Sequence, residues 1–176
     1  MNPIKPDDLP IVTLDTASIE ADPAAYQFRH GGEAGSGVVE DHRIKSEQWD
    51  PILHGSPLLV HKRGDKYFVV DGHHRLEFAK RVGKTSLAVQ VLDEAQGYGV
   101  QEARIAAAYK NMAHGGNTML ESAEVFREAA RPSVHKQLLP SLKLEGDLTI
   151  AYKLSGLRQT SFDMVKRGEV PVASAA

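Results

Sequence analysis

The residues best suited to chemistry stand together in the run Asp-Gly-His-His-Arg at positions 71–75. Arg75 offers a fork of donors that fits phosphate oxygens, and it keeps its charge near neutral pH. His73 and His74 can donate hydrogen bonds to a phosphate, and either can move a proton. Asp71 can cap a helix, accept a hydroxyl proton or hold Mg²⁺, while Gly72 allows a sharp turn and close approach of a ligand. The run predicts a phosphate site. Its expected catalytic residues are Asp71, His73, His74 and Arg75.

The elements that must position this run are a strand, a tight turn and a helix. A β-branched stretch ends at Val70, and a helical pattern over residues 73–83 begins directly after the Asp-Gly pair. The unpaired amides and the positive dipole at a helix N-terminus favour an anion there. In the alternative, purely structural interpretation, Asp71 caps the helix and the histidines pair with nearby carboxylates. A zinc site is disfavoured, because adjacent histidines splay apart and no third ligand stands at metal-site spacing.

The rest of the chain divides into an α/β part and a helical part. Alternating or β-rich stretches predict strands at residues 10–14, 57–62, 66–70 and 87–92, and the second and third of these form a hairpin. The pattern becomes helical from Gln101 onward. We therefore expect an α/β lobe over residues 1–100 and a helical lobe over residues 101–176. The glycine-rich segment at 30–37 lacks the Gly-Lys-Ser/Thr ending of a nucleotide P-loop, which favours a flexible loop.

Composition limits the classes of protein that the chain can belong to. With 176 residues, 41% hydrophobic and 25% charged, the sequence is that of a soluble globular protein. A net charge of −2 argues against a generally basic nucleic-acid binder but allows a local basic face. The absence of cysteine excludes disulfides, thiolate metal sites and sulfur nucleophiles. Without a membrane-length apolar run or a signal-peptide pattern, we expect no membrane partner and a cytoplasmic location.

The run at 71–75, with Phe78-Ala79-Lys80-Arg81 after it, resembles the signature of the ParB/sulfiredoxin superfamily. Partition proteins carry Gly-Glu-Arg-Arg there, and sulfiredoxins carry Gly-Cys-His-Arg. The Asp-Gly-His-His-Arg spelling is most similar to archaeal free-serine kinases and to ParB-like domains of phages, plasmids and mobile elements. The resemblance spans Leu9 to about Arg131. It implies an α/β (α+β) fold with a small mixed sheet, followed by an all-helical C-terminal lobe. His73 stands where sulfiredoxins need a cysteine, which excludes their chemistry.

A second resemblance follows the last predicted strand. Residues 109–114 and 118–123 are similar to the third box of partition proteins, Glu-Asn-x-x-Arg followed by a Pro-(Leu/Ile)-Glu-Glu-Ala helix. The match implies that Asn111 lies beside the triphosphate as a metal ligand and that His114, in place of the arginine, contacts the nucleotide. Lys110 replaces the glutamate and, being protonated, cannot ligate Mg²⁺, so the chain departs from the family's CTP-type metal coordination. The alternative is an ordinary amphipathic helix with an asparagine near its end.

A third and weaker resemblance concerns the segment at 26–30, which stands where partition proteins place a polar loop over the nucleotide. The resemblance implies that Arg29 and His30 reach the same phosphates as the main motif. A solvated loop is the alternative.

The C-terminal part is loosely similar to a helix-turn-helix. Residues 149–156 resemble its first helix, whereas residues 162–173 resemble the segment that follows the motif in partition proteins. That alignment leaves too little chain for a full recognition helix between them. Four basic residues make this end compatible with contacts to a DNA backbone. They are Lys153, Arg158, Lys166 and Arg167. An ordinary charged surface helix is the alternative.

The resemblance implies a ParB-like nucleotide-binding protein of phage or plasmid type. It would bind ATP or CTP with Mg²⁺, hydrolyse it slowly and act on or with DNA as a possible homodimer, with nuclease activity left open. The expected nucleotide-binding residues are Gly72, His73, His74, Arg75, Arg29, Asn111 and His114, and the expected metal ligand is Asn111. Two alternatives stay open. One is a small-molecule phosphotransferase resembling free-serine kinases, and the other is a ParB-like interaction module without catalysis.

Overall fold

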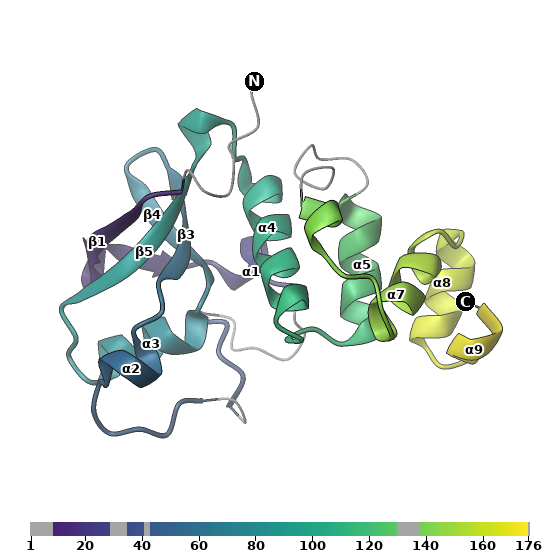
Figure 1. The fold of residues 1–176 in the computed structure, drawn as a ribbon, viewed down its shortest axis with the longest axis horizontal. Coiled ribbons are helices and arrows are strands. Elements are labelled where there is room, and N and C mark those ends of the chain that lie inside the picture. The colour runs from purple at the N-terminus through teal and green to yellow at the C-terminus, as the bar shows by residue number, and fades with distance from the viewer. Residues whose placement is uncertain (1–8, 29–34, 41–42, 130–137, 176) are drawn as a thin grey trace. The chain divides into compact units, whose positions relative to one another are not determined.

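The computed structural model describes residues 9–28, 35–40, 43–129 and 138–175. The fold class is α+β, as expected: a five-stranded mixed sheet with helices, followed by a helical part (Figure 1). The chain divides into two compact units, Met1–Ala107 and Ala108–Ala176. Each unit is described by itself.

The sheet of the first unit has the strand order β1-β5-β3-β4-β2. Its strands are β1 (Ile11–Asp15), β2 (Ile19–Ala21), β3 (Leu58–Arg63), β4 (Lys66–Asp71) and β5 (Ser86–Asp93). Antiparallel pairs join β1 to β5 and β3 to β4, whereas β2 runs parallel to β4 and β5 runs parallel to β3. The strands predicted at 10–14, 57–62, 66–70 and 87–92 are thus confirmed. Strand β2 was missed, because three residues are too few to show an alternating pattern.

Side-chain alternation along the strands builds a core on each face of the sheet. On one face, β3 contributes Leu58 and Val60, and these pack with Leu76 and Ala79 of the helix α3 (His73–Arg81). On the other face, β3 contributes Leu59, which packs with residues of α1 (Pro23–Tyr26) and α4 (Val100–Ala113). The helix that carries the predicted site is therefore fixed on the sheet by its own buried stripe.

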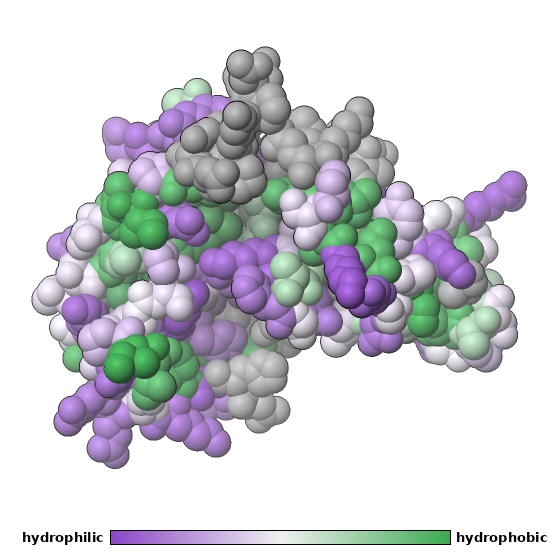
Figure 2. All heavy atoms as spheres, viewed as in Figure 1, coloured by the Kyte–Doolittle hydropathy of each residue, from purple (hydrophilic) through white to green (hydrophobic). Residues whose placement is uncertain are grey.

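Short helical pieces complete the first unit. They are η2 (Thr16–Ser18), α2 (Pro51–His54) and η4 (Glu94–Gln96). The start of α2 is fixed by Asp50, whose carboxylate accepts hydrogen bonds from the amides of Ile52 and Leu53. The Ile52 and Leu53 side chains are 93% and 73% exposed, and they form the apolar patch over α2 in Figure 2.

The second unit is helical. Its elements after α4 are α5 (Met119–Ala129), η5 (Leu139–Ser141), α7 (Asp147–Ser155), α8 (Gln159–Lys166) and α9 (Val172–Ala175). Thr118 and Glu121 form a reciprocal capping box at the start of α5. Phe126 of α5 packs edge-on against Tyr109 and Tyr152, at centroid distances of 5.9 and 5.4 Å. Within the described residues, no helix is both long and apolar enough to cross a bilayer.

Candidate functional site

The predicted motif lies on the turn that joins β4 to α3. Strand β4 ends at Asp71, Gly72 occupies the N-cap position with a φ of 98°, and α3 begins at His73. A Cβ atom on Gly72 would lie 2.4 Å from Cδ2 of Leu58 and 3.0 Å from Nη2 of Arg75. Both the left-handed backbone and the lack of space therefore require glycine, as the sequence predicts. The N-cap position belongs to Gly72, and Asp71 precedes it.

Arg75 and Asp71 form an ion pair across this turn, with 3.7 Å between Nη2 and Oδ2. The Arg75 guanidinium also donates through Nη1 to the carbonyl of Ser56. Both side chains are largely covered, with exposed fractions of 21% and 17%. Burial lowers the pKa of Arg75, while the Asp71 carboxylate acts in the opposite direction. The guanidinium still keeps its charge at any physiological pH, since an arginine pKa starts far above neutrality.

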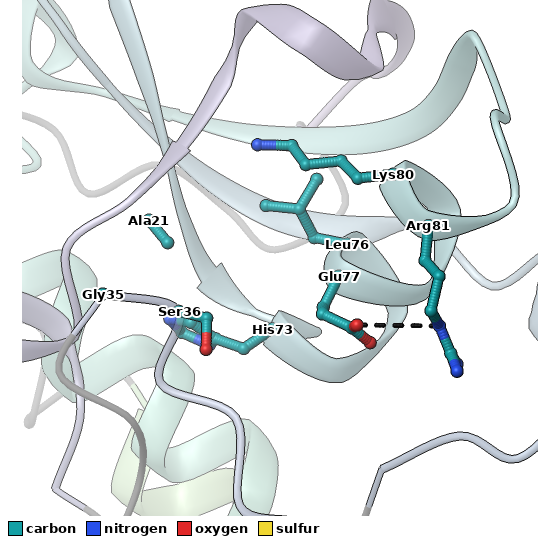
Figure 3. Close-up of a pocket in the computed structure, with 8 residues that line it drawn as sticks. All are labelled: Ala21, Gly35, Ser36, His73, Leu76, Glu77, Lys80 and Arg81. Carbon is teal, nitrogen blue, oxygen red and sulfur yellow. Dashed lines mark ion pairs between the residues drawn. The ribbon is translucent and has the colours of Figure 1, made fainter.

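His73 borders a cavity of about 450 Å³. It is 6% exposed, and its ring faces Ser36 in Figure 3. The other residues around the cavity are Ala21, Gly35, Ser36, Leu76, Glu77, Lys80 and Arg81. This volume lies in the range of small-molecule sites. The cavity begins at the N-terminus of α3, where the helix dipole favours an anion.

His74 has a different partner. Its Nε2 accepts a hydrogen bond of 3.1 Å from the backbone amide of Val39. His74 therefore contacts the segment that follows Ser36, whereas Arg75 contacts Ser56 and Asp71. Successive residues on an α-helix point about 100° apart, so three consecutive side chains separate instead of meeting at one point. Of the three, His73 is the one that lines the cavity.

Four polar or charged residues of the cavity were not singled out as site residues from the sequence. Glu77, Lys80 and Arg81 follow His73 on α3 at spacings of four, seven and eight residues, the signature of one helix face. Ser36 comes from the glycine-rich segment. The helical spacing from His73 is the signal that points to the first three. Ser36 has no comparable signal, because only the tertiary fold brings it to α3.

The cations on this face also brace the fold. Lys80 Nζ donates to the carbonyl of Ile19 over 2.7 Å, which ties α3 to β2. Arg81 donates to the carbonyl of Ile44 over 2.5 Å and lies 3.6 Å from the Glu77 carboxylate, the ion pair dashed in Figure 3. Lys80 and Arg81 thus contribute positive potential to the cavity while their groups are held in place.

The remaining predicted residues lie elsewhere. Arg29 and His30 lie outside the described residues. Asn111 and His114 stand at the end of α4, in the second unit. His114 Nδ1 donates to the carbonyl of Lys110 over 2.7 Å, so this ring caps the C-terminus of its own helix.

A Mg²⁺ ion would find few protein ligands. Among the described residues, no group of three or more His, Asp or Glu side chains is arranged to hold a metal ion. Magnesium bound with a nucleotide takes most of its ligands from phosphates and water and needs only one or two protein oxygens. Asp71 at the turn and the Asn111 amide are residues of the predicted set with such oxygens.

Two short helices of the second unit, α7 and α8, follow each other closely. Three residues, 156–158, separate α7 from α8. Phe162 and Val165 are buried, whereas residues 159–161 at the start of α8 are exposed. The resemblance to partition proteins placed residues 162–173 after a helix-turn-helix. In the structure, residues 162–166 belong to α8, which begins at Gln159.

Arg127 of α5 holds the α7–α8 turn. Its guanidinium donates to the carbonyls of Ser155 and Leu157, over 3.0 and 2.6 Å, and to Oε1 of Gln159 over 2.8 Å. It also lies 4.5 Å from the ring centroid of Phe162. One side chain thus fixes the end of α7, the turn and the beginning of α8.

Comparison with known proteins adds a resemblance in fold. No protein-family model matches the chain, and no curated protein matches it significantly. The chain is similar to the crystal structure of the C-terminally truncated chromosome-partitioning protein ParB from Caulobacter crescentus complexed to the centromeric parS site. The identity is 15%, the TM-score is 0.46, and 93% of this chain and 82% of that chain are covered. The chain is also similar to the same protein complexed with CTP-γ-S. There the identity is 15%, the TM-score is 0.37, and 94% of this chain and 89% of that chain are covered.

Proposed function

We propose that the chain is a ParB-like protein that binds a nucleoside triphosphate with Mg²⁺ through its first unit and DNA through its second. The nucleotide, ATP or CTP, is slowly hydrolysed at the β4–α3 turn. In this proposal the triphosphate enters the cavity beside α3, with His73 donating to a phosphate and Arg75 neutralising charge at the turn. Asp71 orients the attacking water or takes its proton.

The observation that carries the nucleotide proposal is the cavity of about 450 Å³ along α3, which extends from His73 in the first turn of the helix to Arg81 in the last. His73 at one end of this cavity is the first residue of α3, directly after the left-handed Gly72, and the helix dipole favours an anion at that end. Lys80 and Arg81 add two positive charges and Glu77 one negative charge along the same helix face. This balance suits a polyanion better than a neutral ligand.

The DNA proposal is supported by α7 and α8. The exposed residues at the start of α8 include Thr160 and Ser161, small polar side chains of the kind that contact base edges in a major groove. The second unit carries nine Lys or Arg and seven Asp or Glu, whereas the first carries twelve and sixteen. The helical unit is therefore the one with a positive formal charge.

Calorimetric titration with ATP and with CTP, with and without Mg²⁺, tests the nucleotide proposal. We expect binding of one nucleotide to the wild type and a loss of affinity of at least about tenfold, or about 1.4 kcal/mol, in His73→Leu and in Arg75→Ala. The matched control is Arg63→Ala, an exposed arginine at the far end of β3, which we expect to bind like the wild type. No heat with any nucleotide would refute the proposal.

Product analysis separates the remaining alternatives. Inorganic phosphate released from the bound nucleotide supports hydrolysis, and phosphoserine formed from added serine supports a phosphotransferase that resembles the free-serine kinases. Nucleotide binding without either product supports an interaction module.

DNA binding is tested with a mixed-sequence duplex in a fluorescence anisotropy titration. A negative charge at the start of α8 would repel phosphates, so we expect Ser161→Glu to weaken binding by about tenfold or more. Thr85→Glu adds the same charge at an exposed position of the first unit and serves as the matched control. Equal affinities of the two variants would contradict a DNA-contacting α8.

A further inference from the structure

We propose that His74 is a positioning residue. It holds the segment 35–39 against α3 by accepting a hydrogen bond from the Val39 amide, and it thereby shapes one wall of the α3 cavity. The sequence motif made His74 a phosphate ligand equivalent to His73, but the geometry assigns the two neighbours different tasks.

The direction of the hydrogen bond between Val39 and His74 shows that Nε2 of His74 is an acceptor. The distance from the Val39 nitrogen to His74 Nε2 is 3.1 Å. A backbone amide can only donate, so Nε2 accepts and the neutral ring carries its proton on Nδ1. Phosphate oxygens are acceptors as well, and they need an N–H group. While His74 holds Val39, its Nε2 cannot donate to a phosphate.

The hydrogen bond between Val39 and His74 also lies close to the cavity wall. Gly35 and Ser36 line the cavity, and Val39 lies three residues beyond Ser36. Between them, Val38 is fully buried, and its amide donates to Ser36 Oγ over 3.2 Å. Gln27 Nε2 donates to the carbonyl of Gly37 over 3.0 Å. The segment is thus fixed to the rest of the unit through Gln27 and Val38, and to α3 through His74.

Amide hydrogen exchange in the full chain, followed by NMR, tests this role directly. His74→Leu removes the acceptor at similar volume, and His74→Asn places its side-chain oxygen too close to the backbone to reach Val39. His74→Gln places an oxygen near the former Nε2. We expect the Val39 amide to exchange at least about tenfold faster in the first two variants and within about threefold of the wild type in the third. The Val89 amide in the sheet serves as the control for intact folding.

The outcomes are distinct. Unchanged exchange at Val39 in His74→Asn, with Val89 protected, would overturn the proposal. Fast exchange at Val39 in His74→Gln as well would also overturn it, because the restored acceptor would not rescue the contact. If the Val89 amide also exchanges fast in His74→Leu, that variant is unfolded. The result for His74→Asn then tests the proposal.

A second arm uses ATP or CTP and rests on the proposed function. With saturating nucleotide, we expect the wild-type Val39 amide to stay protected, and His74→Gln to bind nucleotide like the wild type while His74→Asn binds at least about tenfold more weakly. Loss of Val39 protection on nucleotide binding would show that His74 leaves Val39 for the phosphate and would overturn the proposal. If the wild type binds no nucleotide, the proposed function fails, and the exchange measurements without ligand still decide the role of His74.

Discussion

Adjacent residues of one motif have different surroundings. His73 is 6% exposed and lines the cavity, His74 accepts from Val39, and Arg75 joins Ser56 and Asp71. The reason is helical geometry, which sends consecutive side chains in different directions. Consecutive residues with similar chemistry therefore do not form a cluster of side chains in space when they lie on a helix. The glycine before the run is what allows the helix to start there.

At this scale the first prediction concerns Gly72. We expect Gly72→Ala to lower the free energy of unfolding by about 2–4 kcal/mol, because alanine is strained at positive φ and its Cβ would collide with Leu58. Gly64→Ala is the matched control, since Gly64 also has a positive φ, of 58°, but nothing lies within 4 Å of a Cβ there. We expect the free energy of unfolding to fall by about 1–2 kcal/mol in the control. Urea unfolding measures the stability of both variants. Equal losses of stability would show that the clash with Leu58 makes no contribution.

Elements of the first unit are joined by a buried polar chain. His61 of β3 is fully buried, and its Nε2 donates to the carbonyl of Tyr98 over 2.7 Å. Its Nδ1 accepts from the Tyr26 hydroxyl of α1, also over 2.7 Å. In the neutral ring, Nε2 carries the proton and Nδ1 accepts from the hydroxyl. Burial accordingly lowers the pKa of His61 from its usual 6.5, although the bond to Tyr98 acts in the opposite direction.

This predicts a pH dependence of stability. The unfolded chain takes up a proton at His61 near pH 6.5, whereas the folded chain resists it, so the unfolded state binds more protons below that pH. The contribution of His61 to stability is therefore complete above about pH 6.5 and is lost as the pH falls toward the lowered folded pKa. We expect the free energy of unfolding to fall less between pH 7 and 5 in His61→Gln than in the wild type. If the free energy of unfolding fell equally with pH in both proteins, His61 would not be the source of the pH dependence.

In the second unit, Arg127 is the brace between α5 and the α7–α8 turn. We expect Arg127→Met, which keeps the length but removes the donors, to lower the stability of this unit by about 2–4 kcal/mol, because hydrogen bonds from a charged group to two carbonyls are lost. Arg158→Met, at an exposed arginine of the same turn, is the control and should stay within about 0.5 kcal/mol. Chemical unfolding followed by circular dichroism distinguishes them, and similar losses would show that Arg127 is no brace.

For the whole molecule, the charge is unequally divided. The chain carries −2 in total, yet its second unit alone has two more basic than acidic residues. The overall charge, which argued against a basic nucleic-acid binder, averages two units of opposite sign. A polyanion as long as DNA responds to the local face that it touches, because salt screens the more distant charges.

The salt dependence of DNA binding tests this division. If Lys153 and Arg158 each neutralise one phosphate, the double change to glutamine should reduce the slope of log affinity against log salt by about 1.8. The control is Lys45→Gln with Lys84→Gln, two exposed lysines of the first unit, which should leave the slope unchanged. A reduced slope in the control and not in the test pair would contradict the assignment of DNA to the second unit.

Short-range patterns of residues were enough to predict the local structure around the site. The β-branched run, the Asp-Gly pair and the helical pattern predicted the β3–β4 hairpin, the turn at Gly72 and α3, because each is set by contacts within a few residues. The sequence also predicted the fold class. It did not reveal β2, which is too short for a periodic signal.

The contacts of each motif residue, in contrast, are made with distant parts of the chain and could not be predicted from residue patterns. The Val39 amide lies thirty-five residues from His74 in sequence. Ser36 reaches the cavity and Arg127 reaches the α7–α8 turn across similarly long stretches of chain. Such contacts depend on how sheet, helices and loops pack, and no pattern of neighbouring residues encodes them. Residue type therefore indicated the chemistry available at the turn, and packing selected which side chain faces the cavity.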